Sequence, residues 1–250
     1  MGRLLIDWGS ILIVFVAFGL GGVLKGATGA GAPLIAVPLL ATLYDVPFAV
    51  AVFSIPNVIS NAWQAWTYRK DLNAPGFALT FAVTGAIGAL VGTLMLASLP
   101  PQALLLAVAL VVFAYVAFRF SRPSWQLSWP VARRIVVPVG IVSGGLYGAT
   151  GVSAPVSLTF LNALRLNRPN FVATISLFFF LMAIPQLPML FAYEILTPWR
   201  ALLGAGALIP ILLFMPVGAW LAKRISPEKF DRAILVLLTL LACKILFDAL

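Results

Sequence analysis

The chain of 250 residues lacks histidine altogether and has one cysteine, Cys243. A single cysteine allows no intrachain disulfide, and without histidine or a cysteine cluster the usual ligand sets for zinc and other transition metals are missing. The sequence therefore predicts no metal site and no cofactor.

Acidic residues are scarce as well. All seven lie at or near the ends of apolar stretches: Asp7, Asp45, Asp71, Glu194, Glu228, Asp231 and Asp248. No carboxylate is therefore expected deep in the protein to relay protons across a membrane. Without histidine, a buried acid or a nucleophile paired with a base, no catalytic residue can be nominated, and an enzyme is not expected.

Charge is low overall, at 9% of residues, whereas 62% are hydrophobic and the mean hydropathy is +1.09. Soluble domains have roughly 45–50% apolar and about 25% charged residues. Apolar stretches recur at about the 17–25 residues that a membrane-spanning helix needs, and the alternating pattern of barrel strands is missing. The sequence predicts an all-α polytopic membrane protein embedded in a lipid bilayer.

The net charge of +9 comes from 16 basic and seven acidic residues. Most basic residues lie between apolar stretches, where cytoplasmic loops carry them. Binding to nucleic acid is therefore not expected.

The sequence contains an internal repeat. An offset of 122 residues superposes GATG at 26–29 on GATG at 148–151, Pro33 on Pro155 and Gln64 on Gln186. An offset of 126 then matches Val91-Gly92 to Val217-Gly218. The predicted division is a first repeat at 1–120, a polar cytoplasmic linker at 121–132 and a second repeat at 133–250.

Each repeat is predicted to contain a glycine-broken helical hairpin followed by three transmembrane helices. The hairpins are expected at 9–25 with 31–43 and at 134–146 with 153–164. The remaining spans are expected at 47–67, 76–97 and 102–120, and at 170–191, 199–222 and 228–247. Equivalent loops of the two repeats have opposite charge bias, so the positive-inside rule predicts inverted topology.

The hairpin segment GGVLKGATGAGAP at 21–33 places helix breakers inside an apolar stretch. Unwound backbone at membrane depth is tolerated only where protein buries it or a cavity hydrates it. A helix that restarts there points its N-terminus, an anion-attracting end, into that cavity. The two tips are expected to hold one small anion near the midplane. The candidate residues are Gly26, Ala27, Thr28, Gly29, Gly148, Ala149, Thr150, Gly151 and Ser153, with Pro33 and Pro155 structural at the tips.

Lys25 precedes the first tip, where the second repeat has Tyr147. A lysine inside the membrane is a candidate for anion binding, but one near a helix end can also snorkel to the surface. The glycines have an alternative role too, because Gly22 and Gly26 have the spacing of closely packed helices.

Polar residues follow one face of the next helix at Asn57, Asn61 and Gln64, and Gln186 answers Gln64 in the second repeat. Asn57, Gln64 and Gln186 are therefore further candidates for substrate binding. Interhelical hydrogen bonds, worth about 0.6 kcal/mol on average, explain such residues equally well.

The paired motifs 26-GATGAGAP-33 and 148-GATGVSAP-155 resemble those of the TauE/SafE sulfite exporter family, also called the 4-toluene sulfonate uptake permeases. The resemblance covers nearly the whole chain. It implies a multi-pass permease of the bacterial inner membrane that moves sulfite or a small organosulfonate, most often outward.

Other functions stay open at this point. The same fold could import or export another small anion or sulfur compound, with or without a coupling ion, or serve as a membrane scaffold that transports nothing. A cation channel is disfavoured because the site is basic and has no acidic ring. A homodimer is among the assemblies that the sequence allows.

Overall fold

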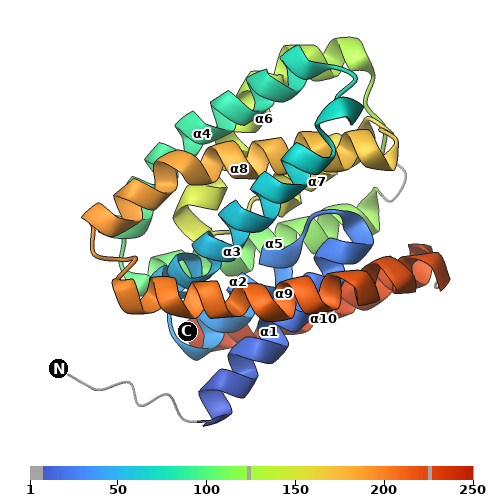
Figure 1. The fold of residues 1–250 in the computed structure, drawn as a ribbon. Coiled ribbons are helices and arrows are strands. Elements are labelled where there is room, and N and C mark those ends of the chain that lie inside the picture. Colours follow the sequence, from blue (N-terminus) through green and yellow to red (C-terminus); the bar gives the residue numbers. More distant parts are fainter. Residues whose placement is uncertain (1–7, 123–124, 225–226, 250) are drawn as a thin grey trace.

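The computed structural model describes residues 8–122, 125–224 and 227–249, and these are helical apart from short connections (Figure 1). This part of the chain has no strand, so the predicted all-α class is confirmed. Asp7 lies outside the described residues, as do the side chains of Glu228, Asp231 and Asp248. The elements are α1 Trp8–Thr28, α2 Ala32–Leu43, α3 Val46–Thr67, the short 3₁₀ helix η1 Arg69–Asp71, α4 Pro75–Ser98, α5 Pro101–Ser121, α6 Trp129–Thr150, α7 Ala154–Ala163, α8 Arg168–Ala192, α9 Pro198–Arg224 and α10 Pro227–Ala249.

Five of the described helices, α3, α4, α5, α8 and α9, are long and apolar enough to cross a membrane. They have 21 to 27 residues, which at 1.5 Å per residue exceeds the roughly 30 Å of a bilayer's hydrocarbon core. Leu12–Thr28 of α1 and all of α2 form shorter apolar helices. The protein is therefore a multi-pass membrane protein.

Side-chain caps fix the start of one long helix in each repeat. The Asp45 side chain accepts a hydrogen bond from the Phe48 amide at 2.6 Å, and the Asn167 side chain accepts one from the Asn170 amide at 3.0 Å. Asp45 and Asn167 are equivalent at the repeat offset of 122, and a proline follows in the first turn of both α3 and α8. The two repeats therefore begin these helices in the same way.

Three helix boundaries differ from the sequence-based expectation by more than two residues. Helix α6 begins at Trp129 rather than 134, because Pro130 suits a first turn, so the last four residues of the expected linker are helical. Helices α1 and α6 continue to Thr28 and Thr150, three and four residues beyond their expected ends. Only residues 29–31 and 151–153 are unwound, because a glycine with positive φ is enough to end each helix.

Six helices pack one against the next in the order α6, α4, α8, α3, α9, α1. Replacing each helix by its equivalent in the other repeat gives the same order reversed. Figure 1 shows α4 and α6 at one side of the molecule, α9 at the other, and α3 and α8 between them. Exchanging the repeats turns the contact of α4 with α6 into that of α9 with α1, and leaves the contacts of α3 with α8 and of α5 with α10 unchanged. Each hairpin thus packs mainly on a helix of the opposite repeat.

Glycines permit the two closest of these helix contacts. A Cβ on Gly26 would lie 1.9 Å from the Met215 carbonyl oxygen of α9, and one on Gly148 would lie 2.3 Å from the Ala89 carbonyl oxygen of α4. On the facing helices, Gly92 and Gly218 would clash with backbone in the same way. Because these glycines are repeat equivalents, close helix packing explains Gly26 and Gly148, as the packing alternative predicted.

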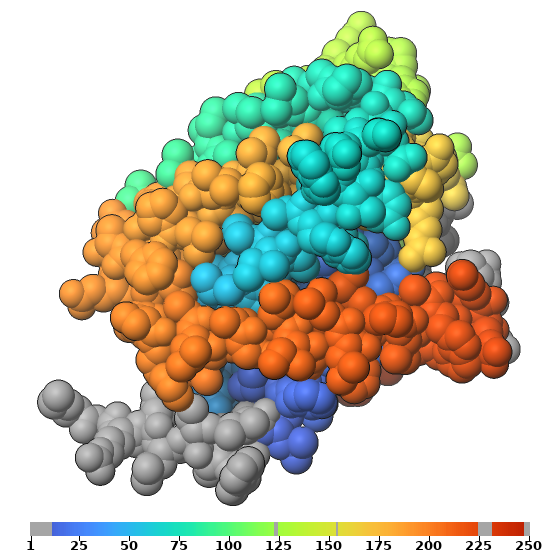
Figure 2. Space-filling model, viewed as in Figure 1, coloured from blue at the N-terminus to red at the C-terminus, as the bar shows by residue number. Residues whose placement is uncertain are grey.

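The surface is apolar where lipid is expected to lie. Helix α9 crosses the face shown in Figure 2, and Leu202, Ile209 and Leu213 of this helix are each at least 60% exposed. In water such a surface would be a large apolar patch, whereas in a bilayer it contacts hydrocarbon.

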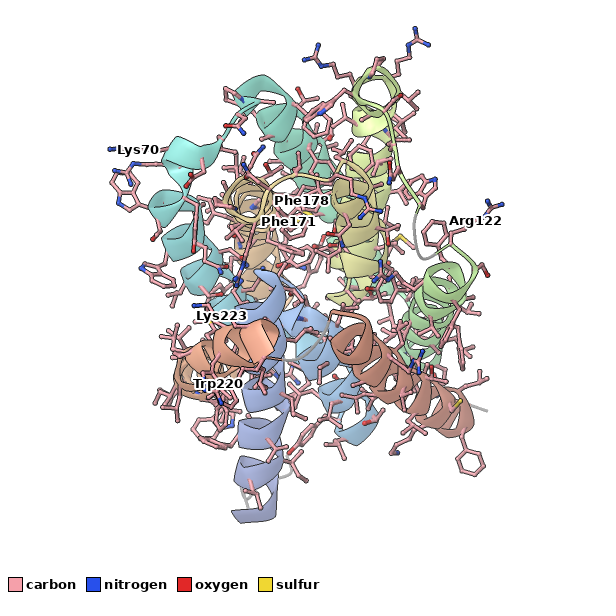
Figure 3. The ribbon with its side chains drawn as sticks, turned by 90° about the vertical axis from the view of Figure 1, so that its right-hand side faces the viewer. Lys70, Arg122, Phe171, Phe178, Trp220 and Lys223 are labelled. Atoms are coloured by element: carbon pink, nitrogen blue, oxygen red, sulfur yellow. The ribbon has the colours of Figure 1, made fainter. Side chains whose placement is uncertain are left out.

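Basic residues gather at one end of the molecule. Figure 1 shows the connections α3 to α4, α5 to α6 and α7 to α8 at the right-hand end, where α9 also ends, and the connections α4 to α5 and α8 to α9 at the left. Figure 3 looks onto the right-hand end and shows Lys70, Arg122 and Lys223, which come from three separate segments. The segments at this end carry Arg69, Lys70, Arg122, Arg133, Arg134, Arg165, Arg168, Lys223 and Arg224.

Candidate functional site

The first hairpin tip is a three-residue turn between α1 and α2. Gly29 and Gly31 have φ of 83° and 98°, a conformation that glycine adopts without steric cost, and the Gly29 amide donates to the Lys25 carbonyl at 2.7 Å. Pro33 then occupies the first turn of α2. The glycines at 29 and 31 are therefore required by the turn.

The second tip repeats this construction. Gly151 has φ of 73°, and its amide donates to the Tyr147 carbonyl at 2.7 Å. Ser153 follows, fully buried, and Pro155 lies in the first turn of α7. Both tips thus end a helix with a left-handed glycine and restart it with a proline.

The threonines of the two motifs bond within their own tips. Thr28 Oγ1 donates to the Leu24 carbonyl at 2.8 Å, and Thr150 Oγ1 donates to the Leu146 carbonyl at 2.7 Å. The same oxygens accept from the amides of residues 30 and 152 at 3.3 and 3.2 Å. In this conformation the hydroxyls close the ends of α1 and α6, so their role as donors to a substrate stays a prediction.

Each tip rests on the beginning of a long helix of the opposite repeat. A Cβ on Gly29 would lie 2.4 Å from Val172 of α8, and one on Gly151 would lie 3.0 Å from Val50 of α3. Val50 and Val172 are themselves repeat equivalents. The two tips therefore lie against different helices, and the side chains one turn before each tip are joined through residues of α3.

Lys25, in the last turn of α1, is one of these side chains. It is 3% exposed, and its Nζ donates to Asn61 Oδ1 of α3 at 2.7 Å. The snorkelling alternative is therefore wrong for this structure, because the ammonium group points into the protein. Among the described residues no carboxylate lies within ion-pairing distance of it, so its charge has an amide oxygen as partner rather than a counter-ion.

Tyr147, in the last turn of α6, joins the same hydrogen-bonded chain. Asn61 Nδ2 donates to Asn57 Oδ1 at 2.7 Å, and Asn57 Nδ2 donates to Tyr147 Oη at 2.8 Å. Lys25 and Tyr147, which are repeat equivalents, are thus connected through one turn of α3. We call Lys25, Asn61, Asn57 and Tyr147 the polar chain.

Two buried glutamines lie on α3 and α8, at equivalent positions of the two repeats. Ser176 Oγ of α8 donates to Gln64 Oε1 of α3 at 3.3 Å. Gln186, the repeat equivalent of Gln64, is 1% exposed, and its Nε2 finds no hydrogen-bond partner within the described part of the chain. The interhelical-bond alternative therefore describes Asn57 and Gln64 in this structure, whereas Gln186 keeps unused donors.

Sequence reasoning left Asn61, Tyr147, Ser176 and Arg168 out of the candidate site. Asn61 and Tyr147 were recognisable, one by its place on the polar face of α3 and the other by its equivalence to Lys25. Arg168 looked like an ordinary loop cation, yet its Nη2 donates to the Gly26 carbonyl at 2.9 Å. Nothing in the sequence marks that contact across 142 residues.

The arrangement is suited to an anion. Lys25 supplies a formal positive charge in a region where the other groups are neutral, and a buried charge without a counter-ion is costly unless a ligand of opposite sign offsets it. No group of metal-binding side chains is found among the described residues. The four residues of the polar chain are each at most 3% exposed, so the site is closed and helices must move to admit a ligand.

A family model described as Sulfite exporter TauE/SafE matches residues 13–245. The chain belongs to the TauE/SafE sulfite exporter family. This family comprises membrane transporters, so the protein is a transporter rather than an enzyme, and it acts on a small sulfur-containing anion in a lipid bilayer. No curated protein and no solved structure matches the chain.

Proposed function

We propose that the protein moves sulfite or a small organosulfonate anion across the bacterial inner membrane, outward under ordinary conditions. The observation that carries this proposal is Lys25, a buried cation whose partner is an amide oxygen rather than a carboxylate. A transported anion would supply the missing negative charge, which favours entry of an anion over a cation.

The anion is bound beside the polar chain, where Lys25 offers its charge and Asn57, Gln64 and Gln186 offer amide donors. Gln186 is included because its Nε2 is buried without a partner among the described residues, although no contact joins it to the polar chain. The tip residues Gly26 to Gly29, with Gly148 to Gly151 and Ser153, supply backbone amides to the anion when the hairpins move.

Transport proceeds by alternating access of the two hairpins. The first helix of each hairpin packs closely on one helix of the opposite repeat, α1 on α9 and α6 on α4, and each hairpin is the moving element of the cycle. The repeats have inverted topology, with the basic loops in the cytoplasm; the gathering of basic segments at one end supports this orientation.

Direction follows from the membrane potential. A potential that is negative inside favours anion exit by about 2.3 kcal/mol per charge per 100 mV. No acidic side chain lies in the polar chain, so an uncoupled carrier is the simplest scheme.

The test is flux of labelled sulfite in proteoliposomes held at a clamped potential, with sulfate and methanesulfonate as competitors. Saturable flux that follows the potential is expected, and methanesulfonate is expected to compete if organosulfonates share the site. Absence of flux with folded protein would remove sulfite as the substrate.

A further inference from the structure

Arg168 lies beside the first hairpin tip and has no role in the polar chain. It begins α8 at the basic end of the molecule, and its guanidinium donates to the carbonyl of Gly26, the residue after Lys25. The side chain is exposed, whereas Lys25 is 3% exposed. Two cations therefore flank Gly26, one facing solvent and one inside.

A structural reason for the contact is available. The Ala30 amide, which would bond to the Gly26 carbonyl if α1 continued, bonds instead to Thr28 Oγ1. Arg168 supplies a donor to the Gly26 carbonyl, as basic side chains do at helix ends.

The second hairpin shows that the fold does not need this donor. Helix α6 ends in the same way, with the Val152 amide bonded to Thr150 Oγ1. The Gly148 carbonyl therefore loses its helical amide partner, as the Gly26 carbonyl does. The residue equivalent to Arg168 is Val46, which has no donor to offer. Capping therefore explains how Arg168 is held but not why an arginine is present at only one tip.

We propose that Arg168 forms an outer anion-binding site at the first tip, which receives the anion on the face of the basic loops before it reaches Lys25. One N–H of the guanidinium group is used by the Gly26 carbonyl, and a guanidinium group has five, arranged as a fork that fits an oxyanion. Only the first tip has such a site, because the residue equivalent to Arg168 at the second tip is the uncharged Val46. This inference rests on the proposed function, since it names a second position for the same substrate.

The experiment compares Arg168→Gln and Arg168→Lys with wild type, using labelled sulfite flux over a range of concentrations. Arg200→Gln is the matched control, because Arg200 Nη1 also donates to a backbone carbonyl, that of Ile195 at 2.8 Å, but at the opposite end of the molecule. Arg168→Gln should raise the half-saturating sulfite concentration about tenfold and change the maximal rate less than twofold. Arg168→Lys should recover part of the loss, and Arg200→Gln should match wild type. An unchanged half-saturating concentration in Arg168→Gln would overturn the proposal, and so would equal effects in Arg200→Gln.

A binding measurement tests the outer site at Arg168 separately from the proposed transport of sulfite. Sodium sulfite should raise the melting temperature of purified Lys25→Met protein slightly, through the outer site alone, and should have no effect on the Lys25→Met/Arg168→Gln double variant. Equal responses of these two proteins would refute the outer site even if wild type transports sulfite. Absence of both sulfite flux and sulfite stabilisation in wild type would instead refute the proposed function.

Discussion

At the scale of single residues, the polar chain differs between the two repeats at the position where they would otherwise be equivalent. Lys25 and Tyr147 occupy the same place in each hairpin, yet one is a cation and the other a neutral phenol. A site made by exact repetition would have two cations or none. The charge of the site therefore depends on one side chain, and its neighbours on α3 are neutral amides.

A carboxylate placed beside Lys25 should act as a permanent substitute for the anion. Asn61→Asp keeps the size of the side chain. It replaces the amide oxygen, which lies 2.7 Å from Lys25 Nζ, by a negatively charged carboxylate oxygen. We expect sulfite flux to fall at least tenfold in folded protein, because the buried charge gains a permanent counter-ion.

The control for this prediction is Asn162→Asp, which makes the same chemical change at an exposed position of α7. Its flux should equal that of wild type. Sulfite flux at the wild-type rate in Asn61→Asp would contradict the assignment of Lys25 to the anion.

At the scale of helices, sequence reasoning predicted most elements because their signals are local. Apolar length predicted the spans, and the GATG motifs predicted both interruptions to within four residues. Sequence reasoning could not decide which glycine turns the chain and which packs a helix, because both functions select the same residue. The structure separates them: Gly29 and Gly151 have positive φ, whereas Gly26 and Gly148 touch the backbone of another helix.

The packing role of Gly148 gives a testable difference. A methyl group there would meet the Ala89 carbonyl oxygen at 2.3 Å and the Thr93 amide nitrogen at 2.7 Å, so α4 and α6 would have to separate. We expect Gly148→Ala to lower the stability by about 1–3 kcal/mol, the usual cost of overpacking. Thermal unfolding in detergent, followed by loss of the monodisperse peak, measures this change.

Gly206→Ala is the matched control, because no atom lies within 4 Å of a Cβ built on Gly206 of α9. Its melting temperature should not fall. Equal melting temperatures for Gly148→Ala and wild type would mean that the contact of α4 with α6 is looser than described.

At the scale of the whole molecule, the repeat relates helices that are far apart in sequence. Local patterns could not predict that α1 packs on α9 rather than on its own repeat, because this contact depends on the surfaces of both helices. In the structure the main contact of one hairpin is matched by the equivalent contact of the other. The inverted orientation in the membrane stays a prediction.

Cysteine accessibility tests that orientation. In a Cys243→Ser background, Leu99→Cys and Tyr193→Cys place exposed thiols at one predicted end, and Lys70→Cys, Arg122→Cys and Lys223→Cys place them at the other. A membrane-impermeant maleimide should label the first pair in intact cells and the other three only after permeabilisation. Labelling of Lys223→Cys in intact cells together with Leu99→Cys would exclude inverted repeats.

If the buried charge of Lys25 holds the transported anion, sulfite flux must depend on that side chain, and Lys25→Met removes its charge. Lys70→Met, which removes an exposed lysine from η1, is the control, and both proteins are reconstituted at equal density with the potential clamped. We expect sulfite flux through Lys25→Met to fall to the rate of protein-free liposomes, and flux through Lys70→Met to stay within twofold of wild type. Flux through Lys25→Met at the wild-type rate would contradict this role of Lys25.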